Sequence, residues 1–160
     1  MIWAVSLLFW IDYTRLILTI YRIGCYLNSR KKNVFFLPFY ILNKLTYRLL
    51  EIIYGFSLPF TAKIGKNVCF KHGLYGVFIS SKAVIGDNVI IMHQVTIGSN
   101  FGSDKDIVAP NIGNDVFIGP GAKIIGNVVI HDYSKIGANA LLTNQICEQG
   151  IYITRRSEKM

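Results

Sequence analysis

The sequence predicts an all-β parallel β-helix that follows an α-helical N-terminal region. Two observations support this prediction. From Ile64 onward, aliphatic residues recur at every sixth position, whereas residues 1–56 consist of long apolar segments with few charges. A period of six fits neither the 3.6-residue turn of a helix nor the two-residue alternation of a lone strand. It is typical of coils in which short strands alternate with turns.

Residues 1–56 are predicted to form an apolar, basic region with one helix over about 4–28 and a second after Pro38. Up to Glu51 this region carries seven Lys/Arg and two acidic residues, in a chain of net charge +8. A spanning helix needs about 20 apolar residues with few charges, and Asp12 and Arg15 interrupt the first segment. The charge and apolarity disfavour a nucleic-acid partner and leave two main interpretations open. The helices either pack in an oligomer or over the β-helix, or attach peripherally to an anionic membrane surface.

Residues 57–147 are predicted to be the β-helix, and residues 148–160 a C-terminal tail. Val and Ile fill the interior of short strands well, and the Gly and Asn residues after the aliphatic positions suit turns. We therefore expect the regularly spaced isoleucines to point inward. In the second half of the domain these are Ile112, Ile118, Ile124, Ile130 and Ile136.

Two interruptions of the period predict surface loops. The spacing from Phe70 to Ile79 is nine, so three extra residues enter around "HGLYG". The spacing from Ile97 to Ile112 is fifteen, which predicts a loop over about 99–111. Insertions in a repeat array lie at the surface, often on the binding face.

Cysteine and histidine usage predicts no metal site. There are three cysteines without a Cys-x-x-Cys pair and three histidines without metal-ligand spacing. Reduced thiols in a cytoplasmic protein are the expected state. In the membrane interpretation, the protein lies at the inner face of the cell membrane.

Three stretches, "LPFTAKIGKNVCFKHGLYGVFISSKAVIGDNV", "VTIG" and "PNIGNDVFIGPGAKIIGN", resemble the hexapeptide-repeat acyltransferases, within their serine acetyltransferase-like branch. The N-terminal "YRIG" and its apolar segment are also similar to polysaccharide-biosynthesis acetyltransferases of this branch. The resemblance implies a left-handed β-helix, a homotrimer with active sites between subunits, and acetyl-CoA as acyl donor.

The resemblance places the catalytic base on His72. An alcohol is a poor nucleophile at neutral pH, and an imidazole, with a pKa near neutrality, can remove its proton. The family's orienting aspartate falls on Ser57, and its Asp before the histidine falls on Lys71. His72 is two residues after the inward position Phe70, and His93 is two residues after the inward position Ile91. This equivalence predicts that His93 lies one coil above His72. We therefore expect Ser57, Lys71 and His93 to support the base or contact the acceptor.

The acyl donor is expected to lie along later coils, where small residues let its pantetheine arm approach the backbone and a lysine can meet its phosphates. The candidate residues are Gly98, Gly119, Gly121, Ala122, Lys123 and Ala138.

The acceptor prediction follows from two departures from the family pattern. The Arg and His that help to hold serine in the family fall on Val108 and Ala109, and a carboxylate needs a charge-assisted partner. The sequence therefore predicts O-acetyl transfer to a sugar hydroxyl in cell-surface polysaccharide biosynthesis. The alternatives are a serine O-acetyltransferase of cysteine biosynthesis and a non-catalytic β-helix scaffold.

Overall fold

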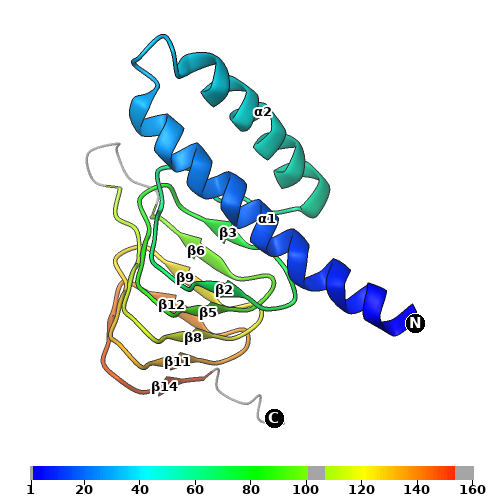
Figure 1. Ribbon diagram of the computed structural model, residues 1–160. Helices are drawn as coiled ribbons and strands as arrows, with labels where there is room; N and C mark the ends of the chain where they lie inside the picture. Colours follow the sequence, from blue (N-terminus) through cyan, green and yellow to red (C-terminus); the bar gives the residue numbers. More distant parts are fainter. Residues whose placement is uncertain (1, 101–106, 154–160) are drawn as a thin grey trace.

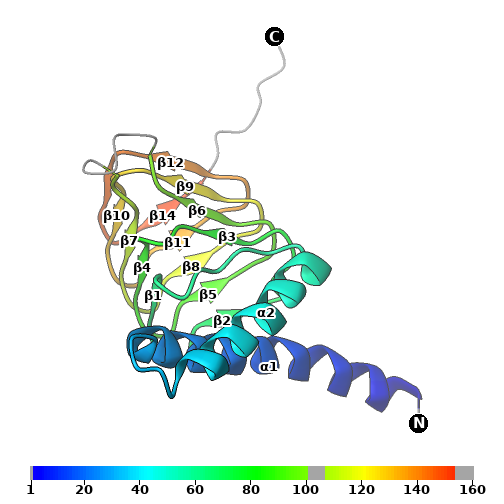
Figure 2. The same ribbon diagram turned by 90° about the horizontal axis from the view of Figure 1, so that it is seen from above.

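The protein is a parallel β-solenoid with two helices at one end, as the sequence predicts. The computed structural model describes residues 2–100 and 107–153, with side chains from Tyr13 onward. The helices α1 (Ile2–Arg30) and α2 (Leu37–Tyr54) precede the strands. They lie beside the first coil, and the N-terminal part of α1 projects beyond the solenoid in both views (Figure 1 and Figure 2).

The solenoid is built from short strands that follow one another around each coil. They form three parallel sheets with orders β1-β4-β7-β10-β13, β14-β11-β8-β5-β2 and β12-β9-β6-β3. The described strands are β1 (Lys63–Ile64), β2 (Cys69–Phe70), β3 (Phe78–Ile79), β4 (Val84–Ile85), β5 (Ile90–Ile91), β6 (Thr96–Gly98), β7 (Asn111–Ile112), β8 (Phe117–Ile118), β9 (Lys123–Ile125), β10 (Val129–Ile130), β11 (Lys135–Ile136), β12 (Leu141–Thr143), β13 (Ile146–Cys147) and β14 (Ile151–Tyr152).

The core consists of ladders of aliphatic side chains, one ladder for each sheet. In the second sheet, Phe70 pairs with Ile91, Ile91 with Ile118, and Ile118 with Ile136 in the next coil. All four side chains are buried. Burial of one such side chain stabilises the fold by about 1.5–3 kcal/mol. The prediction that these residues point inward is confirmed.

Short polar residues stabilise one corner of the solenoid. Asn67, Asn88 and Asp115 all have positive φ angles, which short polar side chains tolerate better than others. The side-chain amide of Asn67 donates to Asn88 across 3.2 Å, and that of Asn88 donates to Asp115 across 3.2 Å. Each coil is thus bonded to the next at the corner as well as along its strands.

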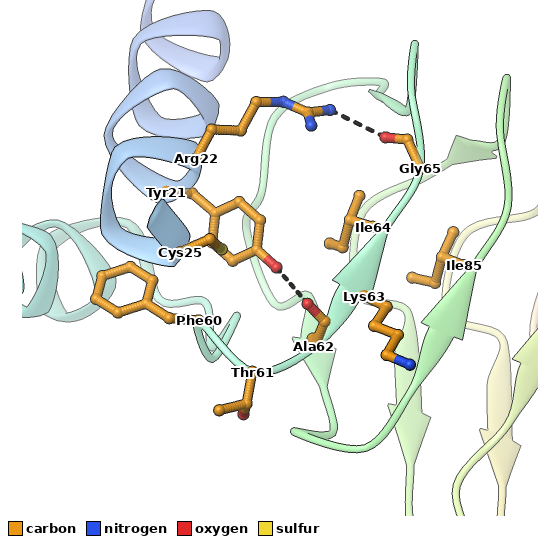
Figure 3. Close-up of a pocket in the computed structure, with 10 residues that line it drawn as sticks. All are labelled: Tyr21, Arg22, Cys25, Phe60, Thr61, Ala62, Lys63, Ile64, Gly65 and Ile85. Atoms are coloured by element: carbon orange, nitrogen blue, oxygen red, sulfur yellow. Dashed lines mark hydrogen bonds between the residues drawn. The ribbon is translucent and has the colours of Figure 1, made fainter. Parts of the chain in front are cut away.

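The helix α1 is bonded to the first coil through two adjacent residues. The Tyr21 hydroxyl donates to the Ala62 carbonyl across 2.8 Å, and the Arg22 guanidinium donates to the Gly65 carbonyl across 2.9 Å (Figure 3). These bonds fix which face of α1 meets the solenoid. Packing of the helices over the β-helix, one of the interpretations left open by the sequence, is therefore present.

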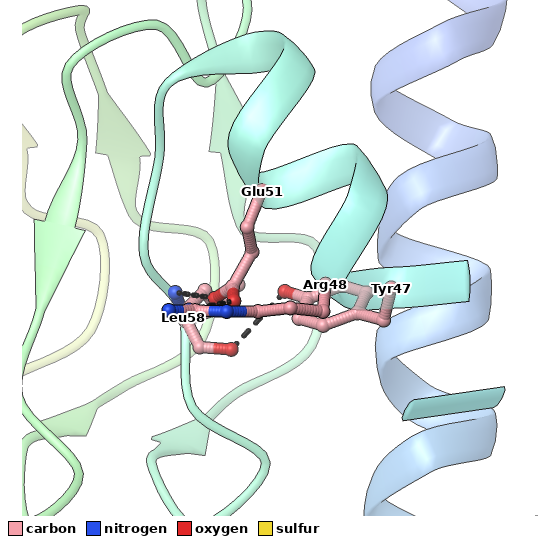
Figure 4. Close-up of polar contacts among 4 residues, drawn as sticks. All are labelled: Tyr47, Arg48, Glu51 and Leu58. Carbon is pink, nitrogen blue, oxygen red and sulfur yellow. Dashed lines mark hydrogen bonds and ion pairs between the residues drawn. The ribbon is translucent and has the colours of Figure 1, made fainter. Parts of the chain in front are cut away.

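The helix α2 is bonded to the chain that leads into the first coil. The Tyr47 hydroxyl donates to the Leu58 carbonyl across 3.1 Å, and the Glu51 carboxylate accepts from the Leu58 amide across 3.1 Å (Figure 4). Glu51 also pairs with Arg48 at 2.8 Å. The helix ends at Gly55, whose φ of 62° suits glycine at a helix C-cap. Within residues 2–100 and 107–153, no helix has the length and apolarity needed to cross a membrane.

Candidate active site

The first interruption of the period forms a loop at a corner of the first coil. Lys71 still bonds through its amide to the Ile91 carbonyl at 2.9 Å, so the ladder is intact up to this residue. His72 and Gly73 then adopt φ angles of 62° and 82° and turn the chain outward. The ladder resumes where the Gln94 amide donates to the Tyr75 carbonyl across 2.9 Å. The insertion therefore presents His72 at the surface, while Leu74 of the same insertion is buried in the core.

His72 and His93 lie next to each other in successive coils. Their ring centroids are 5.9 Å apart and the ring planes meet at 84°. The predicted neighbourhood is thus confirmed, with one correction: the backbone partner of the His93 turn is Tyr75, because the insertion moves His72 off the ladder. His72 is exposed and His93 is half-buried. The Nδ1 atom of His93 is buried and has no hydrogen-bond partner within the described part of the chain.

A pocket of about 640 Å³ lies between α1 and the first coil, and His72 lines it. The other described lining residues include Thr14, Arg15 and Leu18 of α1 and the segment from Asn67 to Gly73. Arg15 and Lys71 bring two cationic side chains to the same pocket as the imidazole. The sequence reasoning missed the contribution of α1. The available signal was Arg15 itself, one of the few charged residues in a largely apolar helix.

Tyr13 of α1 packs between Tyr54 of α2 and the loop that carries His72 and Gly73. Its ring stacks on Tyr54 of α2, with centroids 4.9 Å apart and planes 10° from parallel. Its hydroxyl oxygen lies so close to Gly73 that any Cβ at this position would overlap it. Glycine is therefore required here both by space and by the positive φ angle.

Ser57 and Lys71, both predicted to support the base, have different surroundings. Lys71 is exposed and lines the pocket with His72. Ser57 forms a bridge with Phe78, and its amide donates to the Val77 carbonyl across 2.9 Å. Ser57 thus serves the backbone ladder of the first coil, and no described contact joins it to His72.

Of the residues predicted to bind the acyl donor, Ala122 and Gly119 contribute to the packing of the solenoid. Ala122 is fully buried, so its methyl group faces the core and cannot contact a bound donor. A Cβ on Gly119 would lie 2.7 Å from the Ala138 amide nitrogen, which shows that Gly119 is needed for coil stacking. The Lys123 ammonium donates to the Gln94 carbonyl across 2.8 Å.

Gly98, Gly121 and Ala138 are the other members of this set, and Ala138 is exposed. Gly121 has a φ of 71° at a corner, and its amide donates to the His93 carbonyl across 3.1 Å. A Cβ added to Gly98 would have its nearest heavy atoms 3.7 Å away, which is ordinary contact. Gly98 is thus the glycine of the set where a ligand could approach the backbone.

The second interruption lies only partly within the described residues, because residues 101–106 of the predicted loop fall outside them. At its base, Asn100 and Val108 are joined by two hydrogen bonds of 3.1 and 2.8 Å. Ala109 packs against the core. Neither Val108 nor Ala109 supplies a charge or a hydrogen-bonding side chain.

A second pocket, of about 580 Å³, is lined by Tyr21, Arg22 and Cys25 and by the first strand (Figure 3). Burial raises the pKa of the Cys25 thiol, which keeps it protonated and unreactive. No histidine lines this pocket among the described residues. Nor do the described residues contain a cluster of three or more His, Cys, Asp or Glu that could hold a metal ion.

Comparison with known proteins identifies the family of the chain. The family described as "Bacterial transferase hexapeptide (six repeats)" matches residues 109–144. A serine acetyltransferase of Helicobacter pylori is 36% identical over 126 residues, which are 79% of this chain and 68% of that protein. The chain belongs to the serine acetyltransferase family of hexapeptide-repeat transferases.

Solved structures of serine acetyltransferases share the fold. The soybean serine acetyltransferase apoenzyme superposes with a TM-score of 0.74 at 28% identity, over 90% of this chain and 56% of the soybean chain. A serine acetyltransferase in complex with CoA gives 0.70 at 29% identity, over 86% of this chain and 53% of that one. The present chain therefore spans about half the length of these solved family members.

Proposed function

We propose that the protein is an acetyl-CoA-dependent O-acetyltransferase in which His72 is the general base. The observation that carries the proposal is the position of His72, exposed on a corner insertion at a pocket, in a chain of the serine acetyltransferase family. The non-catalytic scaffold predicted as an alternative has no feature in its favour that outweighs this one.

In the proposed reaction, an imidazole nitrogen of His72 takes the proton of the acceptor hydroxyl while the hydroxyl oxygen attacks the thioester carbonyl carbon. The tetrahedral oxyanion then collapses and the carbon–sulfur bond breaks. The thiolate of CoA leaves and receives the proton from the imidazolium, which gives an acetyl ester and free CoA. The edge-to-face contact with His93 supports a role for His93 in orienting the His72 ring.

For the acceptor we propose L-serine, which corrects the first preference of the sequence analysis. The relatives are named serine acetyltransferases. The loss of charge at Val108 and Ala109 is offset by Arg15 and Lys71, which line the same pocket as His72 and could pair with a carboxylate. A sugar hydroxyl is the second candidate, favoured by the uncharged loop at Val108 and Ala109.

We also propose acetyl-CoA as the acyl donor. One solved serine acetyltransferase of the family is a complex with CoA, and among the glycines predicted to bind the donor, Gly98 has room for close approach. We propose a homotrimer. Phe78 and Leu141, exposed on the outer face of one sheet, offer apolar surface for contacts between copies. A molar mass of one 18.1 kDa chain in solution would contradict it.

The test is a CoA-release assay with acetyl-CoA and either L-serine or a panel of nucleotide-activated sugars. We expect release that depends on L-serine and that falls at least about a hundredfold in His72→Asn. His131→Asn is the matched control, because His131 is an exposed histidine of a later coil. Release with sugars alone would move the acceptor to the second candidate. Equal activity of His72→Asn and wild type would remove His72 from the mechanism.

A further inference from the structure

The helix α2 has two unlike faces. One face, which includes Tyr47, Leu50 and Tyr54, packs against the core. The opposite face carries large apolar side chains at three- and four-residue spacing, each between 53 and 72% exposed: Ile41, Leu42, Leu45, Leu49, Ile52 and Ile53. We call these six residues the α2 apolar face. The turn before α2 adds exposed Val34 and Phe35. Exposed apolar surface this continuous marks an interaction site.

Basic and aromatic residues surround this face. Arg30, Lys31 and Lys32 lie at the turn between the helices, and Lys44 and Arg48 lie on α2. The ammonium groups of Lys31 and Lys44 each lie 5.9 Å from the centre of the Tyr40 ring. The one acidic residue of α2, Glu51, pairs with Arg48, so these two residues together add no net charge, and the positive charge comes from Arg30, Lys31, Lys32 and Lys44. The surface is therefore apolar in the middle and positively charged around it.

The positive charge around the α2 apolar face favours an anionic lipid surface over a second copy of the chain as its partner. A second copy placed face to face would bring the same cations against one another, and like charges across an interface oppose association. An anionic lipid surface offers negative headgroups to the cations and acyl chains to the aliphatic side chains. Such helices lie in the plane of the membrane with the apolar face about 5–10 Å deep.

We propose that the α2 apolar face and the adjoining turn bind an anionic membrane surface peripherally. This inference does not depend on the proposed reaction, because the α2 apolar face includes none of the residues that line the His72 pocket. The helix α2 lies along the membrane surface in this proposal and does not cross the bilayer.

The test is sedimentation of the purified full-length chain with vesicles. One set contains phosphatidylcholine alone and the other contains phosphatidylcholine with an equal amount of phosphatidylglycerol. We expect binding to the second set, with little binding to the first and a decrease as salt is added. Lys31→Glu/Lys32→Glu should weaken this binding by roughly 30-fold or more.

The decisive variant is Leu42→Glu/Leu49→Glu, which places charge in the middle of the α2 apolar face. Its matched control is Ile146→Glu/Ile151→Glu, which changes two solenoid residues of similar exposure, 68 and 71%. The control should sediment like wild type and the α2 variant should not, while both retain the wild-type circular dichroism spectrum.

Two results would overturn the proposal. One is a wild-type chain that does not sediment with anionic vesicles, or an α2 variant that sediments as well as wild type. The other is a smaller particle for the α2 variant than for wild type in solution, which would assign this face to contacts between copies.

Discussion

The imidazole rings of His72 and His93 meet edge to face between successive coils, with centroids 5.9 Å apart. His72 directly follows Lys71, whose amide bonds to the Ile91 carbonyl of the next coil, so the start of the insertion lies beside the turn that carries His93. A side chain of the regular repeat thus contacts a side chain of the interruption.

His93 is predicted to position His72 through its ring. His93→Ala should lower kcat by about tenfold or less, because an aromatic pair contributes about 0.5–1.5 kcal/mol. The KM for L-serine should stay nearly unchanged. His93→Phe keeps the ring and should restore most of kcat. A variant that changes only KM would show instead that the Nδ1 atom of His93 binds the acceptor.

Arg15 is predicted to bind the acceptor carboxylate from α1. Arg15→Ala should raise the KM for L-serine about tenfold, as expected for loss of one charge-assisted hydrogen bond. The KM for acetyl-CoA should not change. Arg30→Ala is the control, since Arg30 lies at the other end of the described part of α1 and its guanidinium faces Tyr26. Equal KM values for the two variants would place the carboxylate elsewhere.

Gly73→Ala is predicted to lower both the melting temperature and the activity. The left-handed conformation costs a non-glycine residue about 1–2 kcal/mol, and the new methyl group would overlap the Tyr13 hydroxyl. Removal of that hydroxyl in Gly73→Ala/Tyr13→Phe should recover part of the loss in a thermal unfolding experiment. A double variant no better than the single one would show that the backbone angle alone is responsible.

The isoleucine ladder is predicted to dominate stability. Ile118→Ala should lower the free energy of unfolding by about 2–5 kcal/mol, and Ile118→Val by about 0.5–1.5 kcal/mol. Ile151→Ala, at an exposed position, should change it by less than about 0.5 kcal/mol. Urea unfolding measures all three, and similar values at both positions would contradict the inward ladder.

Alkaline pH is predicted to destabilise the contact between the helices and the solenoid. Burial raises the pKa of Tyr47 well above its ordinary value. The folded state therefore retains the proton while the unfolded state loses it. This stabilisation is complete below about pH 10, the pKa of a free tyrosine, and is lost as pH rises further. Tyr47→Phe cannot ionise, so its unfolding free energy should fall less steeply above about pH 10 in urea titrations.

The repeat made the solenoid predictable because a period of six determines which side chains face inward. The same rule could have predicted that Ala122 is buried in the core. It belongs to a second buried series with the same spacing, which includes Val116 and Val128. Its small size indicated contact with a ligand, but its position in the series puts it in the core.

The contribution of α1 to the His72 pocket could not be predicted in this way. A local period carries no information on which residues of a distant helix meet a given corner. Contacts such as Tyr21 with Ala62 are 41 residues apart in the chain. The helix positions themselves follow from apolar patterning, and both helices are present where expected, as Ile2–Arg30 and Leu37–Tyr54.

The bonds from Tyr21, Arg22 and Tyr47 have a consequence for association between molecules. The first coil of a solenoid has a neighbour on one side only, so its carbonyl groups could pair with the edge of another chain. In this protein, two such carbonyls, those of Ala62 and Gly65, and that of Leu58 just before the first coil already accept bonds from the helices. The two helices thus cap the first coil and oppose end-to-end association of one solenoid with another.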